Sequence, residues 1–229
     1  MSTEERPVPE SSCGNVLVVL SGRPGAGKTT IGRLLAGRLQ AAYLRTDVIA
    51  GPMLVDGVTE DKARAGRVAY DVAREIAIEN LRAGIPVLID GVHATHERRA
   101  LWRDVSATTD CRLIQFEMTL TDGGEHRRRV ESRQSQGYIG PTWEQILSME
   151  YDDWSEARDG RRMIVEAFDT EAALAQCLAR CDGHRPRLTH ALRHDRAECG
   201  RCGRLCIEGN GRPGVHDDPH GASLVGDMN

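Results

Sequence analysis

A glycine-rich run near the start of the chain contains the residue types that bind phosphate groups. Its residues fit the pattern G-x-x-x-x-G-K-[ST]: Gly22, Arg23, Pro24, Gly25, Ala26, Gly27, Lys28, Thr29 and Thr30. Glycines allow the backbone to turn closely around an anion with its N–H groups pointing inward. In such loops the lysine reaches the β- and γ-phosphates, and the hydroxyl residue after it binds Mg²⁺. The run therefore predicts a site for ATP and Mg²⁺, although a turn that only caps a helix is the alternative.

Two aspartates are candidates for acid–base and metal chemistry. Asp47 follows a short strand expected around 43–44, and Asp90 ends the apolar run 86–90. Ligands of open parallel sheets bind beyond the carboxyl ends of the strands, so both carboxylates are expected at the edge where the phosphate loop lies. Asp47 could accept the proton of an attacking hydroxyl, and Asp90 could hold Mg²⁺ through water or position that hydroxyl. For each residue the alternative is a cap on the following turn.

An arginine-rich stretch, predicted as a helix over 125–135, provides candidates for stabilising a transferring phosphoryl group. Arg129 and Arg133 are four residues apart and so lie on one helix face. Planar guanidinium groups on one face could clamp phosphoryl oxygens as charge spreads over them. The stretch is therefore interpreted as a lid helix followed by a mobile loop over 136–140, and a charged, solvated helix is the alternative.

These residues must be positioned by a scaffold, and strands that alternate with helices predict one. The expected strands are 15–21, 43–44, 86–90, 111–118 and 163–167. The expected helices are 29–40, 62–83, 97–106, 125–135, 142–157 and 171–181. This alternation predicts an α/β fold of the P-loop NTPase class, with a doubly wound, five-stranded parallel sheet and a lid helix.

Composition limits the classes of partner. The chain of 229 residues has 30 Lys and Arg against 34 Asp and Glu, which leaves a net charge of −4. A chain without a strong positive field is a poor nucleic-acid or membrane-surface module. The longest apolar runs are too short to cross a bilayer. The first twelve residues lack the apolar region that a signal peptide contains. A cytoplasmic location is therefore expected. We expect a disordered leader over 1–14, a P-loop domain over 15–182 and a basic, glycine-rich tail over 183–229.

The tail contains four soft metal ligands at short spacing: His194, Cys199, Cys202 and Cys206. Tetrahedral Zn²⁺ sites use these residue types, and the Cys-x2-Cys spacing is common in them. The tail is therefore a candidate zinc knuckle, and a disordered tail with exposed thiols is the alternative.

The order and spacing of these motifs resemble the small P-loop kinases related to polynucleotide 5′-hydroxyl kinases and to antibiotic phosphotransferases. The resemblance covers roughly 15–169 and rests on four segments: 22–29, Thr46-Asp47, 88–90 followed by 97–99, and 127–133. It implies that Asp47 is a general base and that Arg129 and Arg133 match a phosphoryl-binding pair. One position departs from the pattern, because these kinases often carry an arginine three residues after the base, where this chain has Ala50.

The expected function is an ATP-dependent kinase that transfers the γ-phosphoryl group to a hydroxyl of a small metabolite, nucleoside or antibiotic. The net charge and Ala50 weigh against a nucleic-acid acceptor. Two alternative functions are not excluded: a polynucleotide 5′-hydroxyl kinase, and an ATP-binding regulatory module with a zinc-stapled tail. The oligomeric state and the choice between ATP and GTP are also left open.

Overall fold

A five-stranded parallel sheet forms the centre of the computed structural model, which describes residues 15–137 and 140–182. The strand order is β2-β3-β1-β4-β5. The strands are β1 (Val16–Ser21), β2 (Ala42–Arg45), β3 (Val87–Asp90), β4 (Arg112–Thr119) and β5 (Met163–Glu166). This confirms the predicted α/β class and the number of strands. The leader and tail expected over 1–14 and 183–229 lie outside the described residues.

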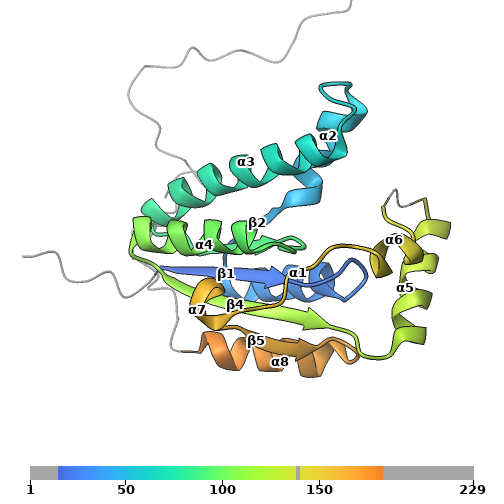
Figure 1. The fold of residues 1–229 in the computed structure, drawn as a ribbon. Coiled ribbons are helices and arrows are strands. Elements are labelled where there is room, and N and C mark those ends of the chain that lie inside the picture. Colours follow the sequence, from blue (N-terminus) through green and yellow to red (C-terminus); the bar gives the residue numbers. More distant parts are fainter. Residues whose placement is uncertain (1–14, 138–139, 183–229) are drawn as a thin grey trace, which may run out of the picture. The chain divides into compact units, whose positions relative to one another are not determined.

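Helices cover both faces of this sheet. The helices α1 (Lys28–Leu39) and α8 (Thr170–Cys181) pack on one face, and α3 (Lys62–Arg82) and α4 (His96–Thr109) pack on the other (Figure 1). Alternate residues of β1 enter the two cores, with Val18 and Leu20 on the α1 side and Leu17 and Val19 on the α3 side. A strand buried on both faces requires a continuous apolar run, which is why the sequence pattern identified β1.

Three of the remaining helices lie near the carboxyl ends of the strands. These are α2 (Thr46–Val55), α5 (Gly123–Ser135) and α6 (Trp143–Leu147), and a short helix, α7 (Glu156–Asp159), precedes β5 (Figure 1). The helix α2 was not predicted. Its sequence includes Gly51 and Pro52, both of which disfavour a helix interior, so the local signal for it is weak. Among the helices that the structure describes, none is long and apolar enough to span a bilayer.

The single helix predicted over 142–157 is wrong. The chain instead forms α6 and α7, with a segment of irregular structure over 148–155 between them. The predicted start is correct, because Thr142 caps α6 and forms a capping box with Gln145. Beyond the start of α6, side chains of other elements bind the backbone carbonyl oxygens: Arg23 donates to those of Ile146 and Met149, and the buried Arg99 of α4 donates to those of Asp152 and Asp153.

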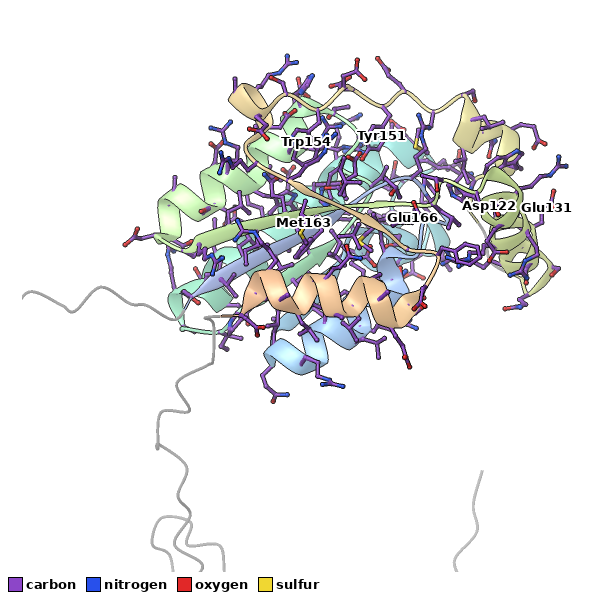
Figure 2. The ribbon with its side chains drawn as sticks, turned by 90° about the horizontal axis from the view of Figure 1, so that it is seen from below. Asp122, Glu131, Tyr151, Trp154, Met163 and Glu166 are labelled. Carbon is purple, nitrogen blue, oxygen red and sulfur yellow. The ribbon has the colours of Figure 1, made fainter. Side chains whose placement is uncertain are left out.

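Arg99 is fully buried and connects α4 to the segment that follows α6. Its guanidinium donates to the Asp152 carbonyl at 2.7 Å and lies 3.2 Å from the Asp159 carboxylate. The rings of Tyr151 and Trp154, both labelled in Figure 2, lie 5.2 and 4.7 Å from the guanidinium carbon. Because a buried charge needs hydrogen-bond partners, these contacts hold the irregular segment against α4.

We expect Arg99→Ala to lower the free energy of unfolding by about 3 kcal/mol, because it leaves the Asp159 carboxylate buried without its guanidinium partner. Urea unfolding followed by circular dichroism measures the change. Arg38→Ala, which removes an exposed arginine of α1, is the control. Equal losses from the two variants would contradict a stabilising role for the buried contacts.

Candidate active site

The glycine-rich loop lies between the carboxyl end of β1 and the first residue of α1. Gly22, Gly25 and Gly27 have φ angles of 133°, 86° and 89°, which favour glycine. A Cβ atom on Gly22 would overlap the carbonyl oxygen of Met118. The helix α1 begins at Lys28, so its unpaired N–H groups point toward the loop, as an anion site requires.

The Lys28 side chain is buried inside this loop. It is 8% exposed, and its ammonium donates to the carbonyl oxygens of Gly22 and Arg23 at 2.7 and 2.9 Å. Burial lowers the pKa of Lys28 to about 8, although attraction to Asp90 opposes this shift. The ammonium therefore stands where phosphate oxygens would enter the loop.

Asp90 contacts the threonine that follows this lysine. The Thr29 hydroxyl donates to Asp90 Oδ2 at 2.8 Å, and the Tyr43 hydroxyl donates to the same oxygen at 2.8 Å. The carboxylate is buried, and the burial of Tyr43 together with the negative charge of Asp90 raises the pKa of Tyr43, which keeps that hydroxyl protonated. A hydroxyl and a carboxylate in contact below the phosphate loop fit the ligand types of Mg²⁺, which also takes phosphate oxygens and water. The contacts of this carboxylate are therefore with the phosphate-loop helix and β2, and none of them caps the Gly91 turn.

Asp47 lies in the first turn of α2. Its side chain is 49% exposed, and it accepts a hydrogen bond from Arg45 at 2.7 Å. Arg45 occupies the N-cap position of α2, and no side chain caps that helix, so the alternative of Asp47 as a cap is not supported. Arg45 was not among the predicted site residues, because its role depends on two carboxylates that come together only in the fold.

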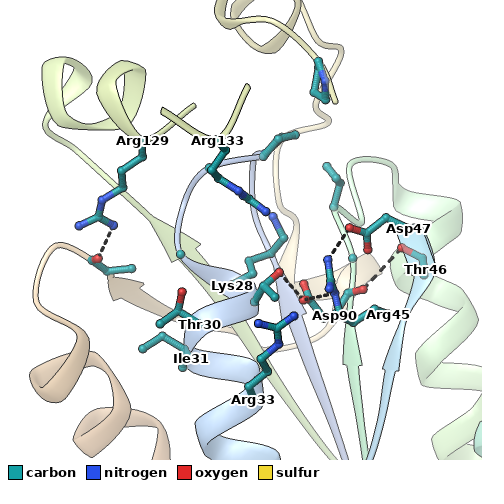
Figure 3. Close-up of a pocket in the computed structure, with 18 of the residues that line it drawn as sticks. Lys28, Thr30, Ile31, Arg33, Arg45, Thr46, Asp47, Asp90, Arg129 and Arg133 are labelled. Carbon is teal, nitrogen blue, oxygen red and sulfur yellow. Dashed lines mark hydrogen bonds and ion pairs between the residues drawn. The ribbon is translucent and has the colours of Figure 1, made fainter. Parts of the chain in front are cut away.

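The side chains of Arg129 and Arg133, which were predicted to clamp a phosphoryl group, make different contacts. Arg133 extends toward Lys28 and contributes to the lowering of its pKa (Figure 3). Arg129 points away, pairing with Glu125 at 2.7 Å and donating to the carbonyl oxygens of Ala167 and Phe168. That both arginines bind one phosphoryl group stays a prediction: both line the same pocket, and without a nucleotide Arg129 is engaged by Glu125 and by two backbone carbonyl oxygens.

One pocket of about 820 Å³ brings most of these residues together. This volume lies within the range of small-molecule sites. Its lining includes the phosphate loop and both aspartates, together with arginines of three elements: Gly25, Gly27, Lys28, Thr29, Thr30, Arg33, Arg45, Asp47, Asp90, Arg129 and Arg133 (Figure 3). The structure therefore collects in one cavity the residues that the sequence spread over more than a hundred positions.

The predicted zinc ligands His194, Cys199, Cys202 and Cys206 lie outside the described residues. Within residues 15–137 and 140–182, no group of three or more His, Cys, Asp or Glu side chains could hold a metal ion. The cysteines of this part are buried free thiols: Cys111, Cys177 and Cys181.

Known proteins share this sequence pattern and this fold. Residues 17–150 match a family model described as AAA domain. Shikimate kinase of Thermobifida fusca is 40% identical over 90 residues, which are 37% of this chain and 51% of the relative. The chain thus spans about half the length of that curated relative.

Two solved structures extend the similarity of the fold. A gluconokinase from Sinorhizobium meliloti superposes with a TM-score of 0.54 and 16% identity, covering 74% of this chain and 92% of its own. The APS kinase of Mycobacterium tuberculosis gives a TM-score of 0.50 and 18% identity, covering 72% and 96%. From the family match over residues 17–150, the chain belongs to the AAA domain family, and its phosphate loop lies on a parallel sheet.

Proposed function

We propose that this protein is an ATP-dependent kinase that transfers the γ-phosphoryl group to a hydroxyl of a small molecule. The observation that carries the proposal is the shared pocket, in which Lys28 and Thr29 of the phosphate loop face the carboxylates Asp47 and Asp90. Phosphoryl transfer needs this combination, because the reaction depends on charge stabilisation and on holding the nucleophile in line.

Each residue has a proposed role in the reaction. The acceptor oxygen forms a bond to the γ-phosphorus as the bond to the β–γ bridging oxygen breaks, and the acceptor proton passes to Asp47. Lys28 binds the β- and γ-phosphates, and Arg133 stabilises charge on the transferring group. Thr29 and Asp90 would hold Mg²⁺, which neutralises phosphate charge when it is bound.

A small acceptor is supported by the charge of the chain and by its relatives. The net charge of −4 provides no extended field for a nucleic-acid strand. Several similar proteins, among them shikimate kinase, gluconokinase and APS kinase, are named for small substrates. We therefore propose a metabolite, nucleoside or antibiotic hydroxyl as the acceptor class.

Transfer of labelled γ-phosphate from ATP to a panel of small alcohols and 5′-hydroxyl oligonucleotides tests this proposal. The expected result is a labelled small molecule from the wild-type protein and none from Lys28→Ala. Labelling of oligonucleotides alone would replace the proposal with a polynucleotide kinase. Tight ATP binding without transfer to any acceptor would favour a regulatory module.

The lowered pKa of Lys28 predicts a pH dependence of ATP binding. In the free protein the ammonium is present below about pH 8 and is lost as the pH rises through that value. Because a neutral amine does not attract phosphate, ATP affinity should be full near pH 7 and roughly tenfold weaker one pH unit above this pKa. Titration with a fluorescent, non-hydrolysable ATP analogue at pH 7 and pH 9 measures the change. Lys28→Arg keeps its charge across this range and should not show this loss, which separates Lys28 from the titration of the nucleotide itself.

A further inference from the structure

We propose that Arg45 is a positioning residue that holds the candidate base Asp47 in a fixed relation to Asp90. The inference rests on the proposed kinase function, and it concerns a residue to which the sequence assigned no role. Arg45 is the last residue of β2 and is paired in register with Asp90, the last residue of β3. Two adjacent parallel strands therefore end on an arginine and an aspartate at the edge of the phosphate site.

The Arg45 guanidinium lies between the two carboxylates. Its Nη2 atom is 2.7 Å from Asp47 Oδ2, and its Nε atom is 3.5 Å from Asp90 Oδ2 (Figure 3). The Arg45 side chain is only 15% exposed, so water screens these contacts weakly. A guanidinium is planar and rigid, so a hydrogen bond to Asp47 at one atom and an ion pair with Asp90, without a hydrogen bond, at another restrict the distance between the two carboxylates.

The two ends of this bridge differ in rigidity. Asp90 is almost fully buried, and Thr29 and Tyr43 both donate to its Oδ2 atom, so it is a fixed point in the core. Asp47 is half exposed, and Arg45 supplies the hydrogen bond that its carboxylate accepts. Through Arg45, the buried Asp90 thereby determines the position of the exposed Asp47 carboxylate. A general base must be held close to its productive geometry, because a displacement of about 1 Å can cost roughly a hundredfold in rate.

Steady-state kinetics of Arg45→Ala and Arg45→Lys test the inference. We expect kcat to fall by roughly 10- to 100-fold in both variants, since lysine keeps the charge but lacks the planar fork. The KM values for ATP and for the acceptor should stay within about twofold of wild type, because a positioning residue acts on the base and not on substrate binding. Arg82→Ala, which removes an exposed arginine at the end of α3, is the control and should leave kcat unchanged.

Two kinetic outcomes would overturn the inference. A raised acceptor KM with an unchanged kcat would make Arg45 an acceptor-binding residue. An unchanged kcat and KM in both variants would leave it without a part in the reaction. If Arg45→Ala does not fold, Arg45→Lys retains a positive charge beside the buried Asp90 and allows the same measurement.

A crystal structure of Arg45→Lys separates this inference from the proposed function, because it needs no acceptor. We expect the Asp47 side chain to occupy several rotamers in the variant and one in the wild type. A single, unchanged Asp47 rotamer in the variant would overturn the inference even if the wild-type protein phosphorylates every acceptor tested. An ordered wild-type Asp47 in a protein that transfers phosphate to nothing would instead overturn the kinase proposal alone.

Discussion

Replacing Lys28 with alanine should lower kcat/KM for ATP by roughly 10³-fold or more, because it removes the buried ammonium that would meet the β- and γ-phosphates as charge develops on them. In the structure the Lys28 ammonium donates hydrogen bonds to the carbonyl oxygens of Gly22 and Arg23, inside the loop that would enclose the phosphates. The arginines that line the pocket come from α1, β2 and α5, outside the loop, so none of them is expected to replace it. The measurement is the initial rate of labelled phosphate transfer over a range of ATP concentrations.

The chain offers an unusually close control for this variant, since Lys28 and Lys62 are its only lysines. Lys62 is exposed at the start of α3, so Lys62→Ala should leave the rate unchanged. A Lys28→Ala protein that keeps more than about a tenth of the wild-type rate would contradict the role of the ammonium in transfer. Thermal unfolding of both variants tests whether a lower transfer rate comes from loss of the folded state.

Asp47→Asn should lower kcat by about 10²- to 10⁴-fold, the usual contribution of a general base. Asparagine has nearly the same shape and can still accept the hydrogen bond from Arg45, but it cannot take the acceptor proton. ATP binding should be nearly unchanged, because Asp47 accepts its hydrogen bond from Arg45 and acts on Lys28 of the phosphate loop only through its charge. The measurement combines single-turnover transfer with a separate titration of ATP affinity.

The outcome of this variant decides between the two carboxylates of the pocket. A near-normal kcat in Asp47→Asn would assign the base to Asp90, the other aspartate beside the phosphate loop. Asp71→Asn, which changes an exposed aspartate of α3, controls for the loss of one negative charge. Equal losses in Asp47→Asn and Asp71→Asn would mean that general charge, and not proton transfer, explains the effect.

Much of the fold and of the phosphate site was determined by the sequence. The apolar run of β1, the glycines after it and the amphipathic pattern of α1 are local features whose geometry follows from residue type and spacing. Asp47 and Asp90 could be placed beside the loop because the carboxyl ends of parallel strands share one edge of the sheet. The confirmed strands therefore depend on signals within short windows of the chain.

Only the tertiary structure decided where the long cationic side chains point. Both arginines of α5 line the pocket, but Arg129 donates to the carbonyl oxygens of Ala167 and Phe168, nearly forty residues away, while Arg133 extends toward Lys28 (Figure 3). Arg99 donates to the backbone carbonyl oxygens of Asp152 and Asp153, within the stretch 142–157 that was predicted as one helix. Arg45 acquired its two carboxylate partners from β3 and α2 only when those elements met. The physical reason is common to these arginines: an arginine has many rotamers of similar free energy, and the partners that select one of them are supplied by other elements of the fold.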